Sequence, residues 1–144
     1  MTSALDDGTE LRARAAEEVV LAYHRAIDTG RATAGVELFT DDAIFQAKGV
    51  ELVGREAIGS FLADRESQTD RHTVHVVANV SVVRAESDEI ELSALVLLHI
   101  RHADGSYVLE RVLDTTHVVT RGSSGWRVHR RFSRPLNAAR ADAA

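Results

Sequence analysis

The sequence predicts an α+β fold, with helices in the first half of the chain and a long antiparallel sheet in the second. Within residues 10–66, three segments carry apolar side chains at helical spacing. After Asp70 the chain changes to long runs of β-branched residues, which continue to Phe132. Short turns separate these runs, so we expect consecutive strands to pair as an antiparallel meander.

The first half divides into three helices and one hairpin. The first helix is expected from Glu10 to about Gly30, with apolar positions Leu11, Ala15, Val19, Tyr23, Ala26 and Ile27 on one side. A shorter helix follows over residues 32–39. Residues 43–46 and 50–53 predict two short strands joined across Lys48-Gly49. The third helix is expected over residues 56–66.

The second half predicts four strands separated by polar turns. They are expected over residues 72–83, 90–101, 107–121 and 126–134. In the first of them, the alternation places His72, Val74, Val76, Ala78, Val80 and Val82 on one face, which we expect to form a cavity wall. Residues 90–101 are apolar on both faces, so helices should cover one face and a second copy of the chain the other. A homodimer through the outer sheet face is therefore expected.

Composition and charge exclude several classes of protein. The 144 residues fit one domain spanning 1–144, which buries about two thirds of its unfolded surface on folding. The chain has no cysteine, so disulfides, thiolate metal sites and cysteine nucleophiles are excluded. Its net charge of -5 offers no basic field for nucleic acid. No stretch has the form of a signal peptide or a membrane span, so we expect a cytoplasmic protein without membrane partners.

The two ends of the chain carry little to bury. Residues 1–9 and 135–144 are expected to be flexible tails, and the second of them is alternatively a cover over a cavity mouth.

One carboxylate stands at an unusual place. Asp28 falls in the last turn of the first helix, where the helix dipole disfavours the ionised form unless another group compensates. We expect His72, at the start of a strand, to be that group, since an Asp that orients a His forms a simple proton-transfer pair. Purely structural roles are the alternative: Asp28 capping the Thr29-Gly30 turn, and His72 satisfied at a strand end.

An ordered set of short motifs indicates a family. They are Tyr23-x4-Asp28-x-Gly30, Leu38-Phe39-x-Asp41-Asp42-Ala43, Gly54-Arg55-Glu56-Ala57-Ile58, Arg71-His72 and Gly125-Trp126-Arg127-Val128. Across nearly the whole chain this set resembles the SnoaL-like family of the nuclear-transport-factor-like superfamily. The resemblance implies a cone-shaped curved antiparallel sheet, mixed at the short hairpin if at all, that encloses three helices and an internal cavity.

The resemblance also assigns roles to residues. Asp28 and His72 match the Asp and His of scytalone dehydratase, in which His takes the proton and Asp orients it. Tyr23 lies where ketosteroid isomerase has its oxyanion tyrosine, although the base of that isomerase falls near Ala47 here. Asp114 resembles the strand acid of polyketide cyclases. Tyr23 is alternatively a core residue, and Asp114 alternatively caps an irregularity of the sheet.

Other residues are expected around the cavity or away from it. Candidates for substrate binding are Phe45, Phe61, Val74, His99 and Trp126. His99 is alternatively packed against a neighbouring strand. The remaining histidines lack a convergent carboxylate pattern, so neither a metal nor a cofactor is expected. A run of arginines, Arg127, Arg130, Arg131 and Arg134, is expected on a solvated face or subunit contact, with binding of an acidic substrate group as the alternative.

Three functions are compatible with these predictions. The first is a cofactor-free dehydratase, isomerase or polyketide-type cyclase acting on a small hydrophobic cyclic or polyketide-like carbonyl compound. The second is a module that binds a small ligand without changing it, and the third is a dimeric assembly domain. A contact between the Asp28 and His72 side chains at an open cavity favours the first.

Overall fold

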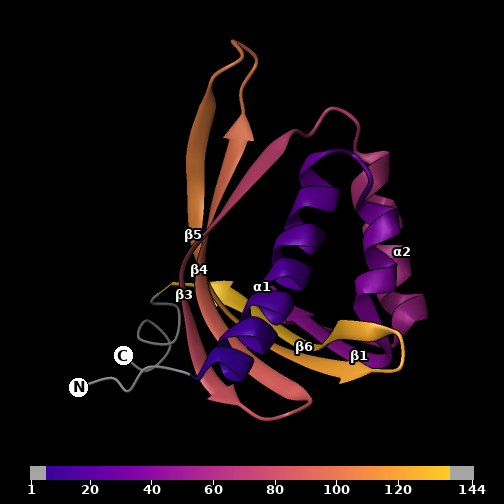
Figure 1. Cartoon of the computed structure of the whole chain (residues 1–144). Coiled ribbons are helices and arrows are strands. Elements are labelled where there is room, and N and C mark those ends of the chain that lie inside the picture. Colours follow the sequence, from indigo (N-terminus) through magenta and orange to yellow (C-terminus); the bar gives the residue numbers. More distant parts are fainter. Residues whose placement is uncertain (1–5, 137–144) are drawn as a thin grey trace.

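A curved six-stranded sheet wraps around the helical half of the chain (Figure 1). The computed structural model describes residues 6–136. Its helices are α1 (Asp7–Asp28), the 3-10 helix η1 (Ala32–Leu38) and α2 (Arg55–Ser67). Its strands are β1 (Phe39–Ala47), β2 (Val50–Val53), β3 (Thr73–Ala85), β4 (Glu89–Arg101), β5 (Tyr107–Gly122) and β6 (Gly125–Pro135). None of these helices is both long and apolar enough to cross a membrane.

The strand order across the sheet is β2-β1-β6-β5-β4-β3. Strand β1 pairs with β6 in parallel, and every other neighbouring pair is antiparallel. The helices lie in the concave side of the sheet (Figure 1). The predicted α+β fold is confirmed, and the mixed character of the sheet arises at the short hairpin.

Both ends of the described chain are more ordered than expected. Helix α1 begins at Asp7 because Asp6 caps it, its carboxylate accepting a hydrogen bond from the Thr9 N–H at 2.7 Å. Pro135 ends β6, and the Leu136 N–H donates to the Val112 carbonyl at 2.9 Å. Residues 6–9 and 135–136 are therefore part of the fold. The rest of both expected tails, and the question of a cover over the cavity, lie outside the described residues.

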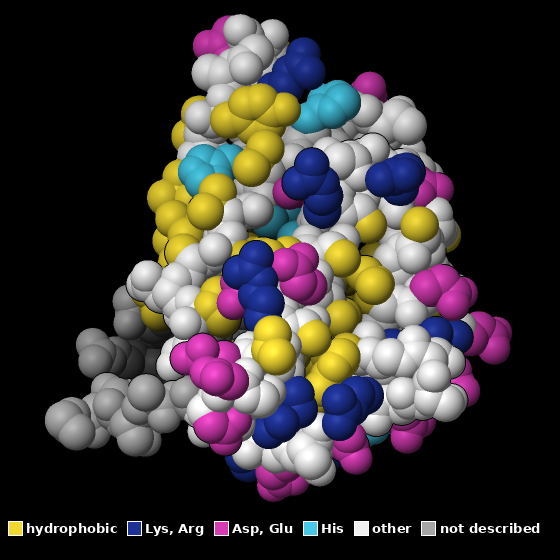
Figure 2. Space-filling model, viewed as in Figure 1, with side chains coloured by type: hydrophobic (Ala, Val, Ile, Leu, Met, Phe, Trp, Pro, Cys, Tyr) yellow, Lys and Arg dark blue, Asp and Glu magenta, His cyan; other side chains and the backbone are white. Residues whose placement is uncertain are grey.

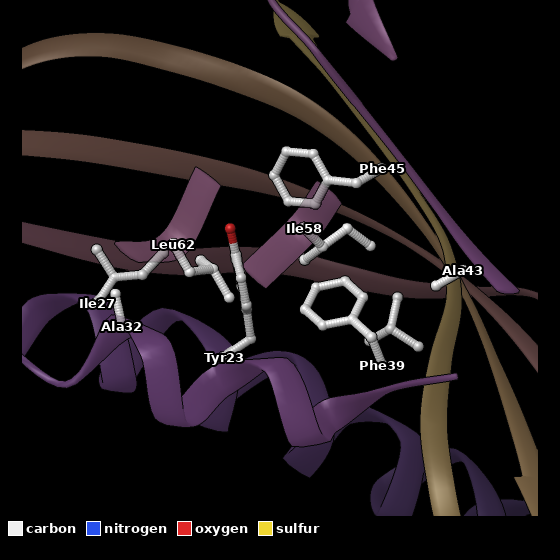
Figure 3. Close-up of a cluster of buried hydrophobic side chains, with 9 residues drawn as sticks. Tyr23, Ile27, Ala32, Phe39, Ala43, Phe45, Ile58 and Leu62 are labelled. Carbon is white, nitrogen blue, oxygen red and sulfur yellow. The ribbon is translucent and has the colours of Figure 1, made fainter. Parts of the chain in front are cut away.

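Two apolar clusters join α1 to the sheet. The larger one contains Tyr23, Ile27, Ala32, Phe39, Ala43, Phe45, Ile58, Leu62 and Val128 (Figure 3). The smaller one, nearer the start of α1, contains Ala16, Val20, Ile90, Leu92 and Val119. Each fully buried large side chain contributes on the order of 2 kcal/mol relative to an exposed one. These clusters fix α1 on the sheet, and Asp28 at its end is thereby held over β3.

A β-bulge reverses the faces of β3. The pairing of β3 with β4 shifts between Ala78 and Ser81, and Asn79 has a positive φ of 52°. Beyond the bulge, Val80 and Val82 pack on the smaller cluster, as the alternation predicted. Before it, Val74 and Val76 point outward and are 39% and 44% exposed. The predicted cavity wall is wrong for this half of the strand, because one extra residue exchanges the two faces.

A second bulge acts in the same way on β6. Val128 pairs with Val119 while Arg130 pairs with Val118, so His129 is the extra residue. Val128 points inward and is 1% exposed, and Arg131, three residues later, points inward as well and is 5% exposed. The expectation that Arg131 lies on a solvated face is therefore wrong.

The outer face of the sheet carries an exposed apolar surface. Its members on β3 and β5 are Val74, Val76, Tyr107 and Leu109, which are 39–48% exposed. Figure 2 shows hydrophobic side chains gathered along this side of the molecule, on the left of the view. This surface is the one that was expected to need a cover.

Candidate active site

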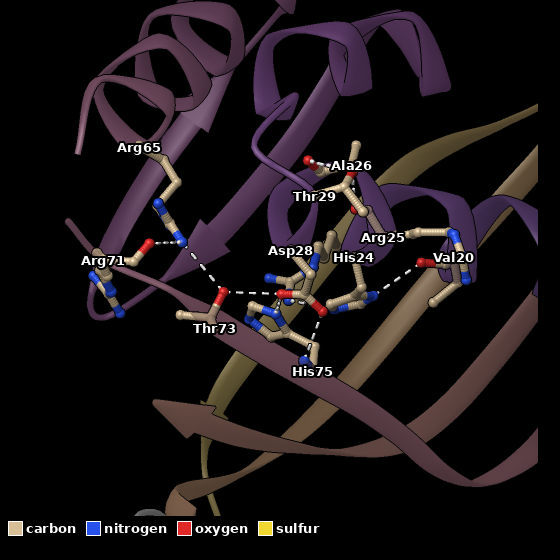
Figure 4. Close-up of polar contacts among 11 residues, drawn as sticks. Val20, His24, Arg25, Ala26, Asp28, Thr29, Arg65, Arg71, Thr73 and His75 are labelled. Carbon is tan, nitrogen blue, oxygen red and sulfur yellow. Dashed lines mark hydrogen bonds and ion pairs between the residues drawn. The ribbon is translucent and has the colours of Figure 1, made fainter. Parts of the chain in front are cut away.

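Asp28 reaches from the end of α1 to the first residues of β3 (Figure 4). One of its oxygens accepts hydrogen bonds from the Thr73 hydroxyl at 2.9 Å and from His75 Nδ1 at 2.6 Å. The other oxygen accepts from the His75 backbone N–H at 2.7 Å. The carboxylate is thus tied to both the backbone and the ring of His75, so it fixes the position of the imidazole.

These contacts determine the tautomer of His75. An ionised carboxylate only accepts hydrogen bonds, so the proton must sit on His75 Nδ1. Nε2 of the neutral ring is then an unprotonated acceptor. His75 lines a cavity between the helices and the sheet, and the contact to Asp28 engages Nδ1 and not Nε2. This is the geometry of a general base oriented by an acid.

The ionised state of Asp28 is favoured in this setting. Burial raises the pKa of the carboxyl group, but hydrogen bonds from His75 and Thr73 outweigh burial and hold the pKa below its ordinary value. These donors provide the compensation that a carboxylate at a helix C-terminus was expected to need. Asp28 does not cap the Thr29-Gly30 turn, because the Thr29 N–H and hydroxyl both bond to the Arg25 carbonyl.

The predicted pairing of Asp28 with His72 is wrong. His72 is exposed, and it precedes the first residue of β3. Because of the β3 bulge, Thr73 and His75 face the helices and the even-numbered residues before Asn79 face outward. The base expected at His72 is therefore found three residues later, at His75. The sequence pattern did not indicate His75, which was one of the histidines not expected to bind a metal.

The cavity beside His75 lies between the helices and the sheet. Its volume is about 130 Å³, and its lining includes Tyr23, Phe45 and Phe61, which were all predicted around it. Figure 3 shows the Tyr23 ring rising from α1 between Leu62 and Phe39, with its hydroxyl oxygen directed away from the helix. Burial raises the pKa of Tyr23. Its hydroxyl group therefore remains a hydrogen-bond donor at neutral pH.

Four other predicted site residues lie elsewhere. Asp114 pairs opposite Leu95 on the outer face, where Arg134 contacts it at 3.6 Å. Val74 and His99 are paired opposite each other, also on the outer face. Trp126 packs on the smaller apolar cluster, beneath the Arg121 guanidinium. The expectations for Asp114 and His99 are wrong because inward residues of β5 are odd-numbered in this region and because β4 buries its even-numbered side chains. Val74 is turned outward by the β3 bulge, and Trp126 packs on the smaller cluster and not on the cavity.

A buried basic group, which sequence reasoning missed, borders the same cavity. Arg131 lies over the rings of Tyr23 and Phe45, with its guanidinium carbon 5.2 Å and 4.9 Å from their centroids. One of its terminal nitrogens is 3.5 Å from His24 Nε2. Its Nε is buried without a hydrogen-bond partner among the described residues. Nothing in the sequence distinguishes Arg131 from the other three arginines of its run, so its burial could not be predicted.

Two neighbouring histidines are neutral. His24 donates from Nδ1 to the Val20 carbonyl at 2.9 Å, so its Nε2 is the acceptor that faces Arg131. Burial, followed by the charge of Arg131, holds the pKa of His24 well below its ordinary value. The same two causes hold the pKa of His117 well below its ordinary value. Arg131 is thus the charged member of this buried group.

Within residues 6–136, no three His, Asp or Glu side chains gather closely enough to hold a metal ion. The polar side chains at and beside the cavity are Asp28, His75, Tyr23 and Arg131.

Comparison with known families identifies the family of this domain. The model of the SnoaL-like domain matches residues 9–132. The chain belongs to the SnoaL-like domain family. The family resemblance inferred from the motifs is thus confirmed. No curated protein matches this SnoaL-like domain.

Several solved structures share the fold. An NTF2-like protein with a cystatin-like fold from Novosphingobium aromaticivorans is 24% identical, with a TM-score of 0.76 and 97% of each chain covered. A protein from the same organism, provisionally assigned as a scytalone dehydratase, is 21% identical, with a TM-score of 0.73, over 92% of this chain and 89% of that one. A protein from Catenulispora acidiphila, solved in complex with S-DNPA, is 19% identical, with a TM-score of 0.78, over 92% and 98%.

Proposed function

We propose that this SnoaL-like domain is a cofactor-independent acid/base enzyme that acts on a small hydrophobic cyclic carbonyl compound. The reaction is a dehydration, an isomerisation or a polyketide-type ring closure. The observation that carries the proposal is the Asp28–His75 pair beside an apolar cavity. The family supports it, as does the likeness in fold to a provisionally assigned scytalone dehydratase. Proton transfer by histidine requires no further group.

In the proposed reaction His75 is the general base. Its Nε2 removes a proton from the carbon next to the substrate carbonyl, and the electron pair of the C–H bond moves onto the carbonyl oxygen as an enolate. Asp28 stabilises the imidazolium that forms. The imidazolium then returns the proton to a hydroxyl group that leaves as water, to another carbon, or to the oxygen of a second carbonyl that the enolate carbon attacks. These three outcomes are dehydration, isomerisation and ring closure.

Tyr23 is the proposed donor to the enolate oxygen. Tyr23 lines the same cavity as His75, and the raised pKa of its hydroxyl group keeps the proton on the oxygen. A donor fixed in a buried site stabilises a developing negative charge more than a donor in water does, because little reorganisation is needed.

The size of the cavity limits the substrate. An engineered cavity of about 150 Å³ in another protein binds benzene. The 130 Å³ found here therefore accommodates about one ring. A larger polyketide-like compound would have to extend through the mouth of the cavity.

The proposal is tested by proton exchange, which does not require the natural substrate. The protein is incubated in D₂O with a panel of one-ring ketones, and loss of the proton next to the carbonyl is followed by NMR. Wild type should accelerate exchange of at least one ketone, and His75→Gln should lower that rate on the order of a hundredfold. His72→Gln is the matched control, since this exposed histidine lies three residues away. Equal rates for wild type and His75→Gln would contradict the proposal.

A ligand-binding module is the second candidate, because the same cavity could hold a compound without changing it. Mass spectrometry of small molecules released on denaturation identifies such a ligand. A bound carbonyl compound that wild type leaves unchanged, with no exchange in D₂O, would favour this function over the enzymatic one.

We also propose that the domain forms a homodimer through the outer sheet face. The exposed apolar side chains of β3 and β5 support this, since a patch of this kind is rare on monomers. Light scattering at micromolar concentration should give twice the chain mass, and Val76→Asp should give the single mass. A single mass for wild type would contradict the proposal.

A further inference from the structure

Arg131 is a buried cation whose bonding is incomplete. It is 5% exposed, and no Asp or Glu of residues 6–136 lies within 4.0 Å of its nitrogens. Among residues 6–136, its one polar side-chain contact, to His24 Nε2, is long at 3.5 Å, and its Nε has no partner there. The neighbouring histidines are neutral and supply no negative charge. Most of its five N–H groups thus lack a strong acceptor.

Such a group is costly to bury in isolation. Taking a charge out of water costs several kcal/mol unless an opposite charge or hydrogen bonds compensate. The rings of Tyr23 and Phe45 return about 0.5–2 kcal/mol each as cation–π contacts. Because Arg131 also lines the cavity, the missing acceptors can come from a bound molecule. A guanidinium binds a carboxylate well, since its N–H groups match two carboxylate oxygens.

The remaining charges of the cavity have the same sign. Its lining contains six basic side chains, which are Lys48, Arg65, Arg71, Arg111, Arg131 and Arg134, and no Asp or Glu. This differs from the whole chain, in which 22 acidic residues outnumber 17 basic ones. An excess of one sign in a cleft raises the local concentration of oppositely charged ligands. The basic character of the lining is therefore a local feature and not a consequence of composition.

The acidic groups near the cavity are already engaged. Asp28, directly behind the lining, directs its oxygens to Thr73 and His75. Asp114 and Glu110 approach Arg134 and Arg111, at 3.6 Å and 3.9 Å, from outside the lining. Arg65 donates to the Arg71 carbonyl and to the Thr73 hydroxyl, which are neutral groups. The described chain thus leaves the positive charge of the cavity largely uncompensated.

We infer that the compound bound in this cavity carries a carboxylate group as well as an apolar ring. The carboxylate lies against Arg131, and the ring lies against the aromatic side chains of the lining. The basic residues around the cavity attract the anion as it enters. The inference rests on the proposed function in treating this compound as the substrate, whereas binding of the anion itself does not depend on turnover.

A matched pair of one-ring probes tests the inference. Benzoate and benzamide have nearly the same size, and only benzoate is charged. Binding of each to wild type is measured by calorimetry or by NMR titration. Benzoate should bind at least about tenfold more tightly, which corresponds to one charge-assisted contact of roughly 1.4 kcal/mol. Equal binding of the two probes, or no binding of benzoate at millimolar concentration, would overturn the inference.

Two variants locate the anion site. Arg131→Met should remove the preference for benzoate, and Arg130→Met is the control because Arg130 is the exposed neighbour on the same strand. Loss of the preference in both variants, or in neither, would overturn the assignment to Arg131. If Arg131→Met does not fold, the comparison of the two probes on wild type still decides whether the cavity selects an anion.

The same measurement separates this inference from the proposed function. His75→Gln should retain the preference for benzoate while losing deuterium exchange. Exchange by wild type without a preference for benzoate would overturn the inference alone. A preference for benzoate without exchange would overturn the enzymatic function alone.

Discussion

Asp28, directly behind the lining of the cavity, and Arg131, within the lining, are bonded in opposite ways. Asp28 receives three hydrogen bonds of 2.6–2.9 Å from two residues of β3. Within the described part of the chain, Arg131 has one long contact to a side-chain nitrogen, contacts to two aromatic rings and an Nε without a partner. The first group is complete without a ligand and holds His75 in one orientation. The second is incomplete without a ligand. The protein therefore supplies the base from its own residues, whereas the anion that pairs with Arg131 comes from the substrate.

Of the changes that test this difference, replacement of Asp28 should have the largest effect on exchange and on stability. Asp28→Asn removes the charge that supports the imidazolium and disturbs the orientation of His75. We expect deuterium exchange to slow on the order of tenfold or more, less than in His75→Gln, because the base itself remains. The variant should also be less stable by about 1–3 kcal/mol, since buried donors on Thr73 and His75 lose a charged acceptor. Urea unfolding measures this loss, and unchanged stability would contradict the description of Asp28 as fully bonded.

Replacement of Arg131 should change stability in the opposite direction from replacement of Asp28. Replacing a buried, unpaired cation with an apolar side chain of similar length is often neutral or stabilising. We therefore expect Arg131→Met to unfold at the same or a higher urea concentration than wild type when no ligand is present. A loss of more than about 2 kcal/mol, as for a broken buried ion pair, would mean that Arg131 is already paired within the protein.

The smallest effect is expected from pH. The pKa values of His24 and His117 are lowered in the folded state by burial and then by Arg131, whereas in the unfolded chain they lie near 6.5. Below pH 6.5 the unfolded state therefore binds more protons, so the free energy of unfolding should fall as the pH decreases. His117→Leu should flatten this dependence between pH 6.5 and 5. The Arg131→Met variant should also show a weaker pH dependence of the free energy of unfolding, because the positive charge near both histidines is gone.

The pH dependence of Asp28 has the same sign over a lower range. Its folded pKa lies below the ordinary value of 3.8, so its contribution to stability is present above that pH and lost as the pH falls through the folded pKa. Comparison of wild type with Asp28→Asn below pH 4 separates this loss from that of the histidines. A difference that does not change with pH would contradict the lowered pKa of Asp28 in the folded state.

The elements of the fold could be predicted from the sequence because their signals are local. Helical spacing and turn residues placed every helix and strand within a few residues of its observed bounds. Asp28 was recognised for a local reason too, as a carboxylate at a helix C-terminus that requires a partner. Tyr23, Phe45 and Phe61 were placed around the cavity on the same basis of pattern and family resemblance.

The faces of the bulged strands could not be predicted by counting residues. One inserted residue at Asn79 exchanges the faces of β3, so that His75 and not His72 meets Asp28. Asn79 itself was an available signal, because asparagine tolerates a positive φ better than most residues and is uncommon inside strands. No residue near His129 marks the second bulge in the sequence. The burial of Arg131 could therefore be seen only in the paired strands of the structure.

The most direct test of the central claim, that Asp28 holds His75 ready as a base, is nitrogen NMR of the ligand-free protein labelled at histidine. In its neutral form, His75 should carry its proton on Nδ1, with a low-field proton signal that reflects the 2.6 Å contact to Asp28. Nε2 should be unprotonated, and Asp28→Ala should abolish the low-field signal. A proton on Nε2 of neutral His75, or an Nδ1 signal that persists in Asp28→Ala, would contradict the account.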